Sequence, residues 1–420
     1  MSGSITLLTN GTRGDVQPLV GLGRGLRDAG AAVTLAAPAG FASFVAPGGL
    51  PFRGFEGNPS DLLGDTAARA ALNDSGDFLD TLRASWRFWR AAQPVYRRML
   101  GSALDACRGA TALGLGLSTV WGVHVADALG ARVVWLPLQP LTKTRHAPSA
   151  LLPVRRGPVR AFAPLTHDLV NAAMTLPWAR VTNAWRREVG LPALPITRLA
   201  GRVCERSALV VYGISPQVVT RPSDWPASHH LAGFWFWEPE PDWKPPLALA
   251  DFLAQGRALA VSFGTAALRD PQRTLRALAE AMRATGLRAV VQLPEALHGA
   301  VAGHPALCAI AGAPHAWLFE RVEAVVHHAG AGTTAHALRA GKPALVIPHA
   351  TDQPFWGERL EALGVGSVLA FRDLTPERLA AALTVLRDDA ALRARAEALG
   401  ARVRSESGVA QAIALLAPAL

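Results

Sequence analysis

Residues 327–334 read HHAGAGTT, a string that combines two histidines, two glycines and two threonines. The apolar run Val322–Val326 before it predicts a buried strand, and Ala335–Ala340 after it predicts a helix. Glycines at such a junction let backbone N–H groups approach an anion, and the helix N-terminus adds positive potential. The pattern fits a diphosphate, although an ordinary tight turn in an α/β domain also uses glycines here. The candidate diphosphate ligands, which supply backbone, hydroxyl and imidazole donors, are His328, Gly330, Gly332 and Thr333.

A second glycine loop, Asn10–Gln17 (NGTRGDVQ), follows the apolar run Ile5–Thr9, which predicts a strand. We expect a helix over Pro18–Ala29 and another strand over Ala32–Ala37, which together make a β-loop-α-β unit of Rossmann type. The loop lacks the GxGxxG pattern, and no acidic residue ends the second strand, so a dinucleotide cofactor is not predicted.

The string HHAGAGTT and the later DQPFW, which begins at Asp352, resemble the donor-binding signature of family 1 glycosyltransferases. The similarity is greatest to the bacterial and fungal sterol-type branch, whose usual text is HHGGAGTT followed by DQPFWG. Residues 11–18 (GTRGDVQP), 262–265 (SFGT) and 314–319 (PHAWLF) also resemble loops of that branch. Two positions depart from the family: Ala329 replaces the first glycine, and His336 stands where plant members carry a ribose-binding glutamate.

The resemblance implies a role for each matched residue. It makes Asp15 the general base that accepts the proton of the attacking hydroxyl. The alternative is that Asp15 only caps the helix that follows it. The other implied sites are Gly264 and Thr265 at the diphosphate, Pro314 and His315 at the nucleotide base, and Asp352 and Gln353 at the sugar hydroxyls.

The resemblance also implies an α/β fold of the GT-B kind, with two facing Rossmann-like domains, parallel sheets and a cleft between them. We expect an N-terminal acceptor-binding domain over residues 1–238 and a C-terminal domain that binds the nucleotide sugar over 239–403. Residues 404–420 should form a helix that packs back toward the first domain.

Composition bounds the class of protein. The chain has 420 residues, which suits two domains, and half of them are hydrophobic. Its net charge is +10, and residues 151–210 carry nine arginines against three acidic residues. This excess serves solubility or attracts an anionic membrane face or an acidic substrate. No nucleic-acid-binding module is evident.

Three cysteines and the absence of a secretory or membrane-spanning pattern favour a cytoplasmic protein, with at most peripheral membrane contact. No DxD arrangement lies near either phosphate loop, so neither a metal nor a cofactor is predicted. The resemblance also predicts the reaction. We expect inverting, metal-independent transfer of a hexose from a UDP- or TDP-linked donor to a hydroxyl of an apolar acceptor. Sterols, other lipids and polyketide-like aglycones all remain open as acceptors. The alternatives are a non-catalytic GT-B partner that activates another enzyme, and a nucleotide-sugar epimerase or hydrolase.

Overall fold

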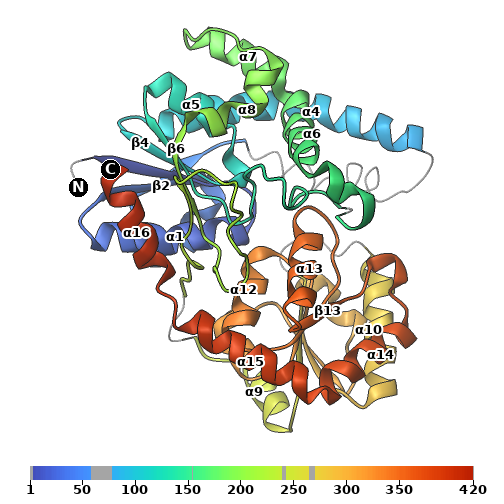
Figure 1. Ribbon diagram of the computed structural model, residues 1–420. Helices are drawn as coiled ribbons and strands as arrows, with labels where there is room; N and C mark the ends of the chain where they lie inside the picture. Colours follow the sequence, from blue (N-terminus) through green and yellow to red (C-terminus); the bar gives the residue numbers. More distant parts are fainter. Residues whose placement is uncertain (1–2, 58–77, 154, 239–242, 264–269, 420) are drawn as a thin grey trace.

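The computed structural model describes residues 3–57, 78–153, 155–238, 243–263 and 270–419, with the side chains of 78–88 left aside. Gly264 and Thr265 therefore lie outside the described residues. Figure 1 shows two α/β domains, with the N-terminal domain above the C-terminal one.

The N-terminal domain is built on seven parallel strands in the order β3-β2-β1-β4-β5-β6-β7. The central strands are almost wholly apolar because helices cover both faces of the sheet. The order reverses between β1 and β4, and in such sheets ligands bind at the carboxyl ends of the strands beside this point. The strands are β1 (Ser4–Leu8), β2 (Ala32–Pro38), β3 (Phe52–Phe55), β4 (Ala112–Leu115), β5 (Arg132–Trp135), β6 (Ser207–Tyr212) and β7 (His229–Leu231).

The C-terminal domain is built on six parallel strands in the order β10-β9-β8-β11-β12-β13. Here the order reverses between β8 and β11, so the loops after these two strands meet at one edge. The strands are β8 (Leu259–Ser262), β9 (Ala289–Gln292), β10 (Leu307–Ile310), β11 (Val325–His327), β12 (Ala344–Val346) and β13 (Gly366–Val368).

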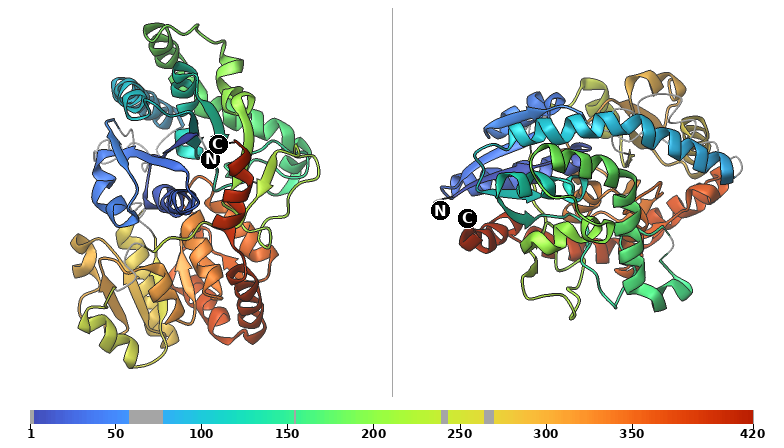
Figure 2. Two further views of the ribbon diagram at one scale, coloured as in Figure 1. Left: turned by 90° about the vertical axis from the view of Figure 1, so that its left-hand side faces the viewer. Right: turned by 90° about the horizontal axis from the view of Figure 1, so that it is seen from above.

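Helices flank both sheets, and Figure 2 shows the long α4 lying across the N-terminal domain. The helices of that domain are α1 (Arg13–Asp28), α2 (Ala42–Val45), α4 (Phe78–Ala106), α5 (Gly122–Leu129), α6 (Ala163–Thr175), α7 (Ala179–Glu188) and α8 (Ile196–Arg206). The helices that follow are α9 (Leu247–Ala254), α10 (Pro271–Thr285), α11 (His315–Glu320), α12 (Ala331–Arg339), α13 (Gln353–Ala362), α14 (Pro376–Asp388), α15 (Ala390–Arg404) and α16 (Gly408–Leu416).

Two helices begin earlier than the sequence pattern predicts. Helix α1 begins at Arg13 rather than at Pro18, because Thr12 and Asp15 form a capping box in front of the proline. Helix α12 begins at Ala331 rather than at Ala335, directly after the N-cap residue Gly330. In both cases the glycine loop is shorter than expected, and Asp15, Gly332 and Thr333 lie in the first turn of their helix.

The last helix returns to the first domain. Helix α16 packs against α1, and its residues Ala412 and Leu416 are buried in the core of the N-terminal domain. Gly25 of α1 permits this approach, because a Cβ at Gly25 would overlap the side chains of Val409 and Ile413. The two helices lie side by side in Figure 1.

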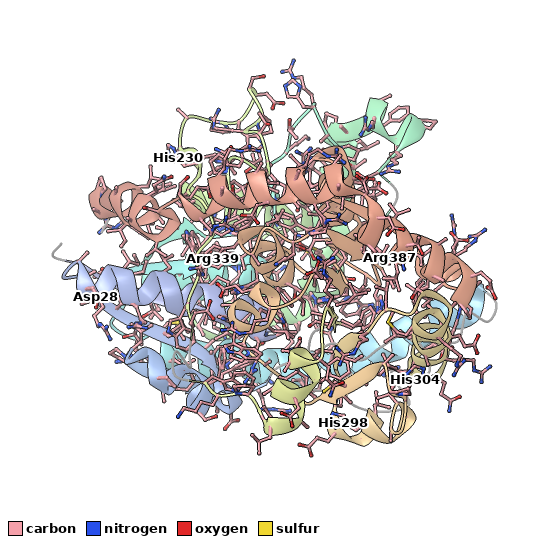
Figure 3. All side chains as sticks on the ribbon, turned by 90° about the horizontal axis from the view of Figure 1, so that it is seen from below. Asp28, His230, His298, His304, Arg339 and Arg387 are labelled. Carbon is pink, nitrogen blue, oxygen red and sulfur yellow. The ribbon has the colours of Figure 1, made fainter. Side chains whose placement is uncertain are left out.

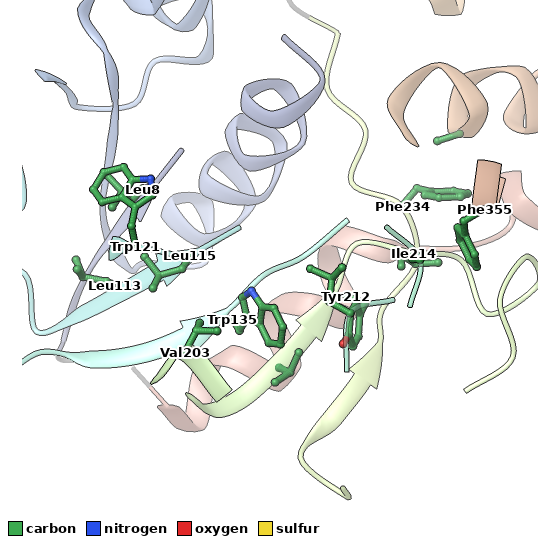
Figure 4. Packing of buried hydrophobic residues seen from close by; sticks show 14 of the residues in the cluster. Leu8, Leu113, Leu115, Trp121, Trp135, Val203, Tyr212, Ile214, Phe234 and Phe355 are labelled. Carbon is green, nitrogen blue, oxygen red and sulfur yellow. The ribbon is translucent and has the colours of Figure 1, made fainter. Parts of the chain in front are cut away.

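The two domains share one apolar cluster. Figure 4 shows Ile214 and Phe234 of the N-terminal side lying beside Phe355 of α13. Polar contacts surround this joint: Arg155 Nε lies 3.3 Å from Glu358 Oε2, and Arg359 donates to the carbonyl of Val218 at 2.8–3.0 Å. The joint fixes how α13 faces the first domain.

Candidate active site between the two domains

The N-terminus of α12 gathers the residues that the sequence predicts at a diphosphate. The N-cap residue Gly330 has no side chain with which to cap the helix, so within the described ranges no N-cap side chain accepts from the first N–H groups of α12. The ring of His328 lies over Gly330, since a Cβ at Gly330 would be 2.5 Å from His328 Nε2. Thr333 is buried in the first turn, and the Gly332 backbone faces the other domain. His328, Gly330, Gly332 and Thr333 therefore surround one helix N-terminus.

Ala329 adopts a left-handed conformation, with φ at 65° and no exposed surface. Its N–H donates to His327 Nδ1 at 3.0 Å, which holds the turn between β11 and α12. Such a φ costs a residue with a Cβ about 1–2 kcal/mol, whereas glycine adopts it freely. The backbone at Ala329 thus has the left-handed conformation that suits the glycine usual in the family, and the alanine adds strain.

The pKa of His328 lies well below neutral pH. Burial lowers the pKa of His328 to about 4, and the nearby carbonyl of Ser262 opposes this shift only in part. His328 Nδ1 is buried without a hydrogen-bond partner among the described residues. The side chain can therefore donate a hydrogen bond to an anion at neutral pH, but it does not bring a positive charge before the anion binds.

Asp15 lies in the third position of α1, close enough to Asp352 of the other domain to be affected by its charge. Its Oδ2 accepts from the N–H of Thr12 at 2.9 Å, and the Thr12 hydroxyl lies 3.2 Å from the same oxygen. Burial raises the pKa of Asp15 to about 6; the Thr12 contacts oppose the shift, and the negative charge of Asp352 adds to it. The two interpretations from the sequence are compatible, because one carboxylate can cap the helix and still titrate near neutral pH.

The first turns of α1 and α12 lie close together. A Cβ at Gly332 of α12 would lie 3.9 Å from Gly14 Cα of α1, so the N-termini of these two helices meet where the domains face each other. In Figure 1 α12 lies below and to the right of α1. Both helix N-termini carry positive potential, and together they favour an anion more than either would alone. The sequence did not predict that these two helix N-termini lie close together, because the residues of one loop do not show where the other loop lies in space.

Asp352 directly precedes α13 and is buried where the two domains meet. Its Oδ2 accepts from Trp356 Nε1 at 2.9 Å, and its Oδ1 accepts from the Thr351 hydroxyl at 3.0 Å. Burial raises the pKa of Asp352, while hydrogen bonds from Gln139, Trp356 and Thr351 oppose the shift. Thr351 itself has φ at 56°, a strained value for a β-branched residue. The loop thus holds the Asp352 carboxylate in one orientation.

Gln353 and Gln139 complete this part of the cleft. Gln353 Oε1 accepts from the N–H groups of His349 and Ala350 at 2.6 and 3.1 Å, which fixes the orientation of the side-chain amide. Gln139 lies in the loop after β5 of the other domain and bonds to Asp352. The sequence places that loop at the carboxyl edge of the sheet, but it does not single out Gln139.

Pro314 and His315, predicted at the nucleotide base, begin α11 beside the end of β8. The His315 ring stacks on Phe319 at 4.6 Å, and its Nε2 lies 3.3 Å from the Ser262 hydroxyl. Burial, together with the nearby charges of His328 and Arg13, lowers the pKa of His315 to about 4. His315 is therefore close to the candidate diphosphate site and to α1, since the charge of Arg13 affects its pKa.

No group of three or more His, Cys, Asp or Glu side chains is placed to hold a metal ion within the described ranges.

Comparison with solved structures defines the class of fold. The glycotransferase of kitacinnamycin matches with a TM-score of 0.72 at 19% identity, covering 100% of this chain and 99% of that one. CalG4, the calicheamicin glycosyltransferase, matches with a TM-score of 0.69 at 20% identity, with the same coverage. The predicted GT-B fold is confirmed.

Sequence comparison then gives the relatives. Residues 5–118 match the glycosyltransferase family 28 N-terminal domain, and residues 276–414 match the erythromycin biosynthesis protein CIII-like C-terminal domain. Sterol 3-beta-glucosyltransferases of Cryptococcus neoformans and Neosartorya fischeri are 31% and 32% identical over 97% of this chain. The chain spans 27% and 29% of the length of these two relatives. The predicted resemblance to the sterol-type branch of GT-B glycosyltransferases is confirmed.

Proposed function

We propose that the protein transfers a hexose from a nucleotide diphosphate sugar to a hydroxyl of a lipophilic acceptor. The observation that carries this proposal is the meeting of Asp15, whose pKa is raised to about 6, with the N-terminus of α12 across the cleft. One group is suited to accept a proton near neutral pH, and the other is suited to stabilise a leaving diphosphate. The names of the relatives and structural neighbours, all glycosyltransferases, support the same reaction.

In the proposed mechanism the acceptor hydroxyl attacks the anomeric carbon while Asp15 accepts its proton. The bond from the anomeric carbon to the diphosphate oxygen breaks, and the nucleoside diphosphate leaves with the bonding electrons. Attack from the face opposite the leaving group inverts the configuration of the anomeric carbon. The N–H groups of α12 and His328 stabilise the negative charge on the departing diphosphate, and each such donor contributes about 3 kcal/mol by analogy with oxyanion holes.

The sugar and the base have their own proposed contacts. Asp352 and the Gln353 amide bind sugar hydroxyls, while Pro314 and His315 lie at the base. We expect uracil or thymine as the base: two of the structural neighbours, SsfS6 and VinC, were solved with thymidine diphosphate. The acceptor class extends from sterols, which the relatives' names specify, to other lipids and polyketide-like aglycones.

Two alternatives are less well supported. A non-catalytic partner of a glycosyltransferase has no need for a carboxylate aimed into the cleft, yet the chain keeps Asp15 and Asp352 there. A nucleotide-sugar epimerase or hydrolase would turn over the donor without an acceptor. None of the relatives named above is described as either of these.

The test is incubation with UDP-glucose or TDP-glucose, with and without a panel of sterol, lipid and polyketide alcohols, in excess chelator. We expect a product one hexose heavier than its acceptor, and little nucleoside diphosphate release without acceptor. Release that needs no acceptor would identify a hydrolase or epimerase. Turnover that chelator abolishes and magnesium restores would contradict the metal-independent mechanism.

We also propose that the face around α6 contacts an anionic membrane surface. Phe162, Leu165 and Leu169 are 61–62% exposed at helical spacing, and Leu176 continues the stripe. Exposed Arg160 lies just before α6 in the sequence and adds charge complementary to anionic lipid. No helix in the described part of the chain is long and apolar enough to cross a bilayer.

The overall basic charge of residues 151–210 is a weaker argument than this stripe, because ion pairs neutralise much of it. Arg186, Arg202 and Arg206 all bond to Asp127, and Arg155 pairs with Glu358. Cosedimentation with phosphatidylserine vesicles tests the proposal.

The double variant Leu165→Ser and Leu169→Ser should lose vesicle binding. As the control, Val385→Ser on α14 removes an apolar side chain that is 52% exposed on the other domain, and this variant should keep vesicle binding. Equal binding of all three proteins would contradict membrane contact through α6.

A further inference from the structure

Helix α13 carries the candidate sugar-binding residues at its start and lies between the two domains. Asp352, Phe355 and Glu358 follow one another at intervals of three residues, so they share one face of the helix. Elsewhere on the helix, Gly357 packs against the sheet of the second domain, where a Cβ at this position would lie 2.9 Å from Val368 Cγ2. The face with Phe355 packs against the first domain instead (Figure 4). Contacts with the first domain can therefore set the position of the start of α13.

Arg155 of the first domain contacts this face through a buried guanidinium. Its Nε donates to Glu358 Oε2 at 3.3 Å, and its guanidinium carbon lies 5.1 Å from the centroid of the Phe355 ring. Its Nη1 donates to the carbonyl of Pro148 at 2.7 Å and to that of Ser149. The side chain is only 5% exposed, and a buried charge depends on all such partners because its removal from water is costly. The position of Glu358 is thus tied to the loop around Ser149.

The loop around Ser149 is itself held by helix α6. The N–H of Ser149 donates to Thr166 Oγ1 at 2.9 Å, and His167 Nε2 lies 3.1 Å from the carbonyl oxygen of Ala147. The side chains of Ser149, Thr166 and His167 are all buried. Arg155 therefore connects α13 to a well-anchored part of the first domain.

Two further hydrogen-bonding residues join α13 to the first domain. Arg359 donates from Nε and Nη2 to the carbonyl of Val218 at 3.0 and 2.8 Å. Gln139 of the first domain forms a hydrogen bond with Asp352 at the start of the helix. The first domain thus reaches α13 through Arg155, and α13 reaches the first domain through Arg359.

The candidate diphosphate ligands lie on another element, at the start of α12. The hydrogen bonds of Arg155 within the described ranges go to α13 and to the loop around Ser149. A shift of α13 would therefore move the sugar contacts and leave the diphosphate contacts in place. This difference separates a role in positioning the sugar from a general role in stability.

We propose that Arg155 is a positioning residue for the transferred sugar, an inference that rests on the proposed function. By holding α13 against the first domain, Arg155 fixes the places of Asp352 and Gln353 before the donor binds. The first domain then contributes to donor affinity through a residue that does not touch the donor. The contribution is specific to the sugar, because the nucleoside diphosphate binds to other elements.

The experiment measures Kd by calorimetry for UDP-glucose and UDP, and for TDP-glucose and TDP, with the full chain. The pair compared is the one whose free nucleotide binds the wild-type protein more tightly. In Arg155→Gln the Kd of the nucleotide sugar should rise about tenfold, as expected for the loss of a hydrogen bond to a charged group, while the Kd of the free nucleotide stays unchanged. Arg155→Lys should behave similarly, because lysine keeps the charge but not the planar fork of donors.

Arg359→Gln tests the same joint from the other side, and it should raise the ratio of the two Kd values as well. The matched control is Arg156→Gln. Arg156 Nε lies 3.6 Å from Glu358 Oε1, but its side chain is 65% exposed, so this pair contributes little and the variant should keep the wild-type ratio. Arg387→Gln should keep it too, since it removes a partly exposed arginine of α14, which Figure 3 labels.

The inference is overturned if Arg155→Gln and Arg359→Gln fold but leave the ratio unchanged, or if they weaken nucleotide and nucleotide sugar equally, as a purely structural joint would. An equal rise of the ratio in Arg156→Gln would also overturn it, because any positive charge near Glu358 would then suffice. These outcomes leave the proposed function standing. A wild-type protein that binds neither UDP nor TDP would instead overturn the proposed function, and this inference with it.

Discussion

Asp15→Asn should make the protein more stable and nearly inactive at the same time. The pKa of Asp15 is raised from 3.8 to about 6, so the folded state holds the proton more tightly than the unfolded state. The ionised carboxylate therefore destabilises the fold increasingly as pH rises from 3.8 to about 6, and the cost is constant above that. A shift of about two units corresponds to about 3 kcal/mol, an upper value because the side chain is only partly covered.

The asparagine removes this cost while it keeps most of the helix cap. Its amide oxygen can still accept from Thr12, since Asn and Asp cap helices about equally well. Loss of the charge at the helix N-terminus offsets up to about 1 kcal/mol. The free energy of unfolding should therefore rise by about 1–2 kcal/mol at about pH 8, and the gain should disappear at about pH 4.

The rate of sugar transfer should fall in Asp15→Asn although its stability rises. A base must be ionised to accept a proton, so kcat/KM of the wild-type protein should fall about tenfold per pH unit below about pH 6. The asparagine cannot act as the base and should slow transfer by about 10²–10⁴-fold at all pH values. An aliphatic alcohol acceptor is required, because an acidic phenol needs less help from a base.

Urea denaturation at both pH values and initial rates across the pH range give the two measurements. Asp28→Asn at the far, exposed end of the same helix is the matched control, and it should change neither quantity. An active Asp15→Asn variant, or a wild-type rate without an acid limb near pH 6, would refute the role of Asp15 as base. If Asp15→Asn raised the free energy of unfolding equally at both pH values, the idea that burial raises the pKa of Asp15 would be refuted.

Three further predictions concern the donor side. His328→Ala should weaken binding of UDP or TDP by calorimetry and slow transfer; unchanged values would make His328 a structural residue. Asp352→Asn should impair affinity for the nucleotide sugar more than for the free nucleotide, and an equal loss for both would argue against a sugar contact. Ala329→Gly should raise the free energy of unfolding by about 1 kcal/mol in urea denaturation, because glycine adopts the φ of 65° without strain; no gain would mean that the turn is already relaxed.

The sequence predicted the fold because its signals are local and contiguous. Apolar runs followed by glycine loops mark strands whose carboxyl ends carry functional residues, and both Asp15 and His328 lie at such ends. The helix starts were less accurate. Pro18 suggested a first helical position, but the capping box of Thr12 and Asp15 begins the helix before it.

The sequence by itself thus determined the two half-sites: the residues at the start of α12 and those at the start of α1. Only the tertiary structure decided how they combine. It brings the N-termini of α1 and α12 together, places Asp352 near Asp15, and sets Arg155 beside Glu358. The physical reason is that the pKa of a side chain and its hydrogen-bond partners depend on burial and on charged groups from distant parts of the chain. The residues next to that side chain in the sequence carry no information on either.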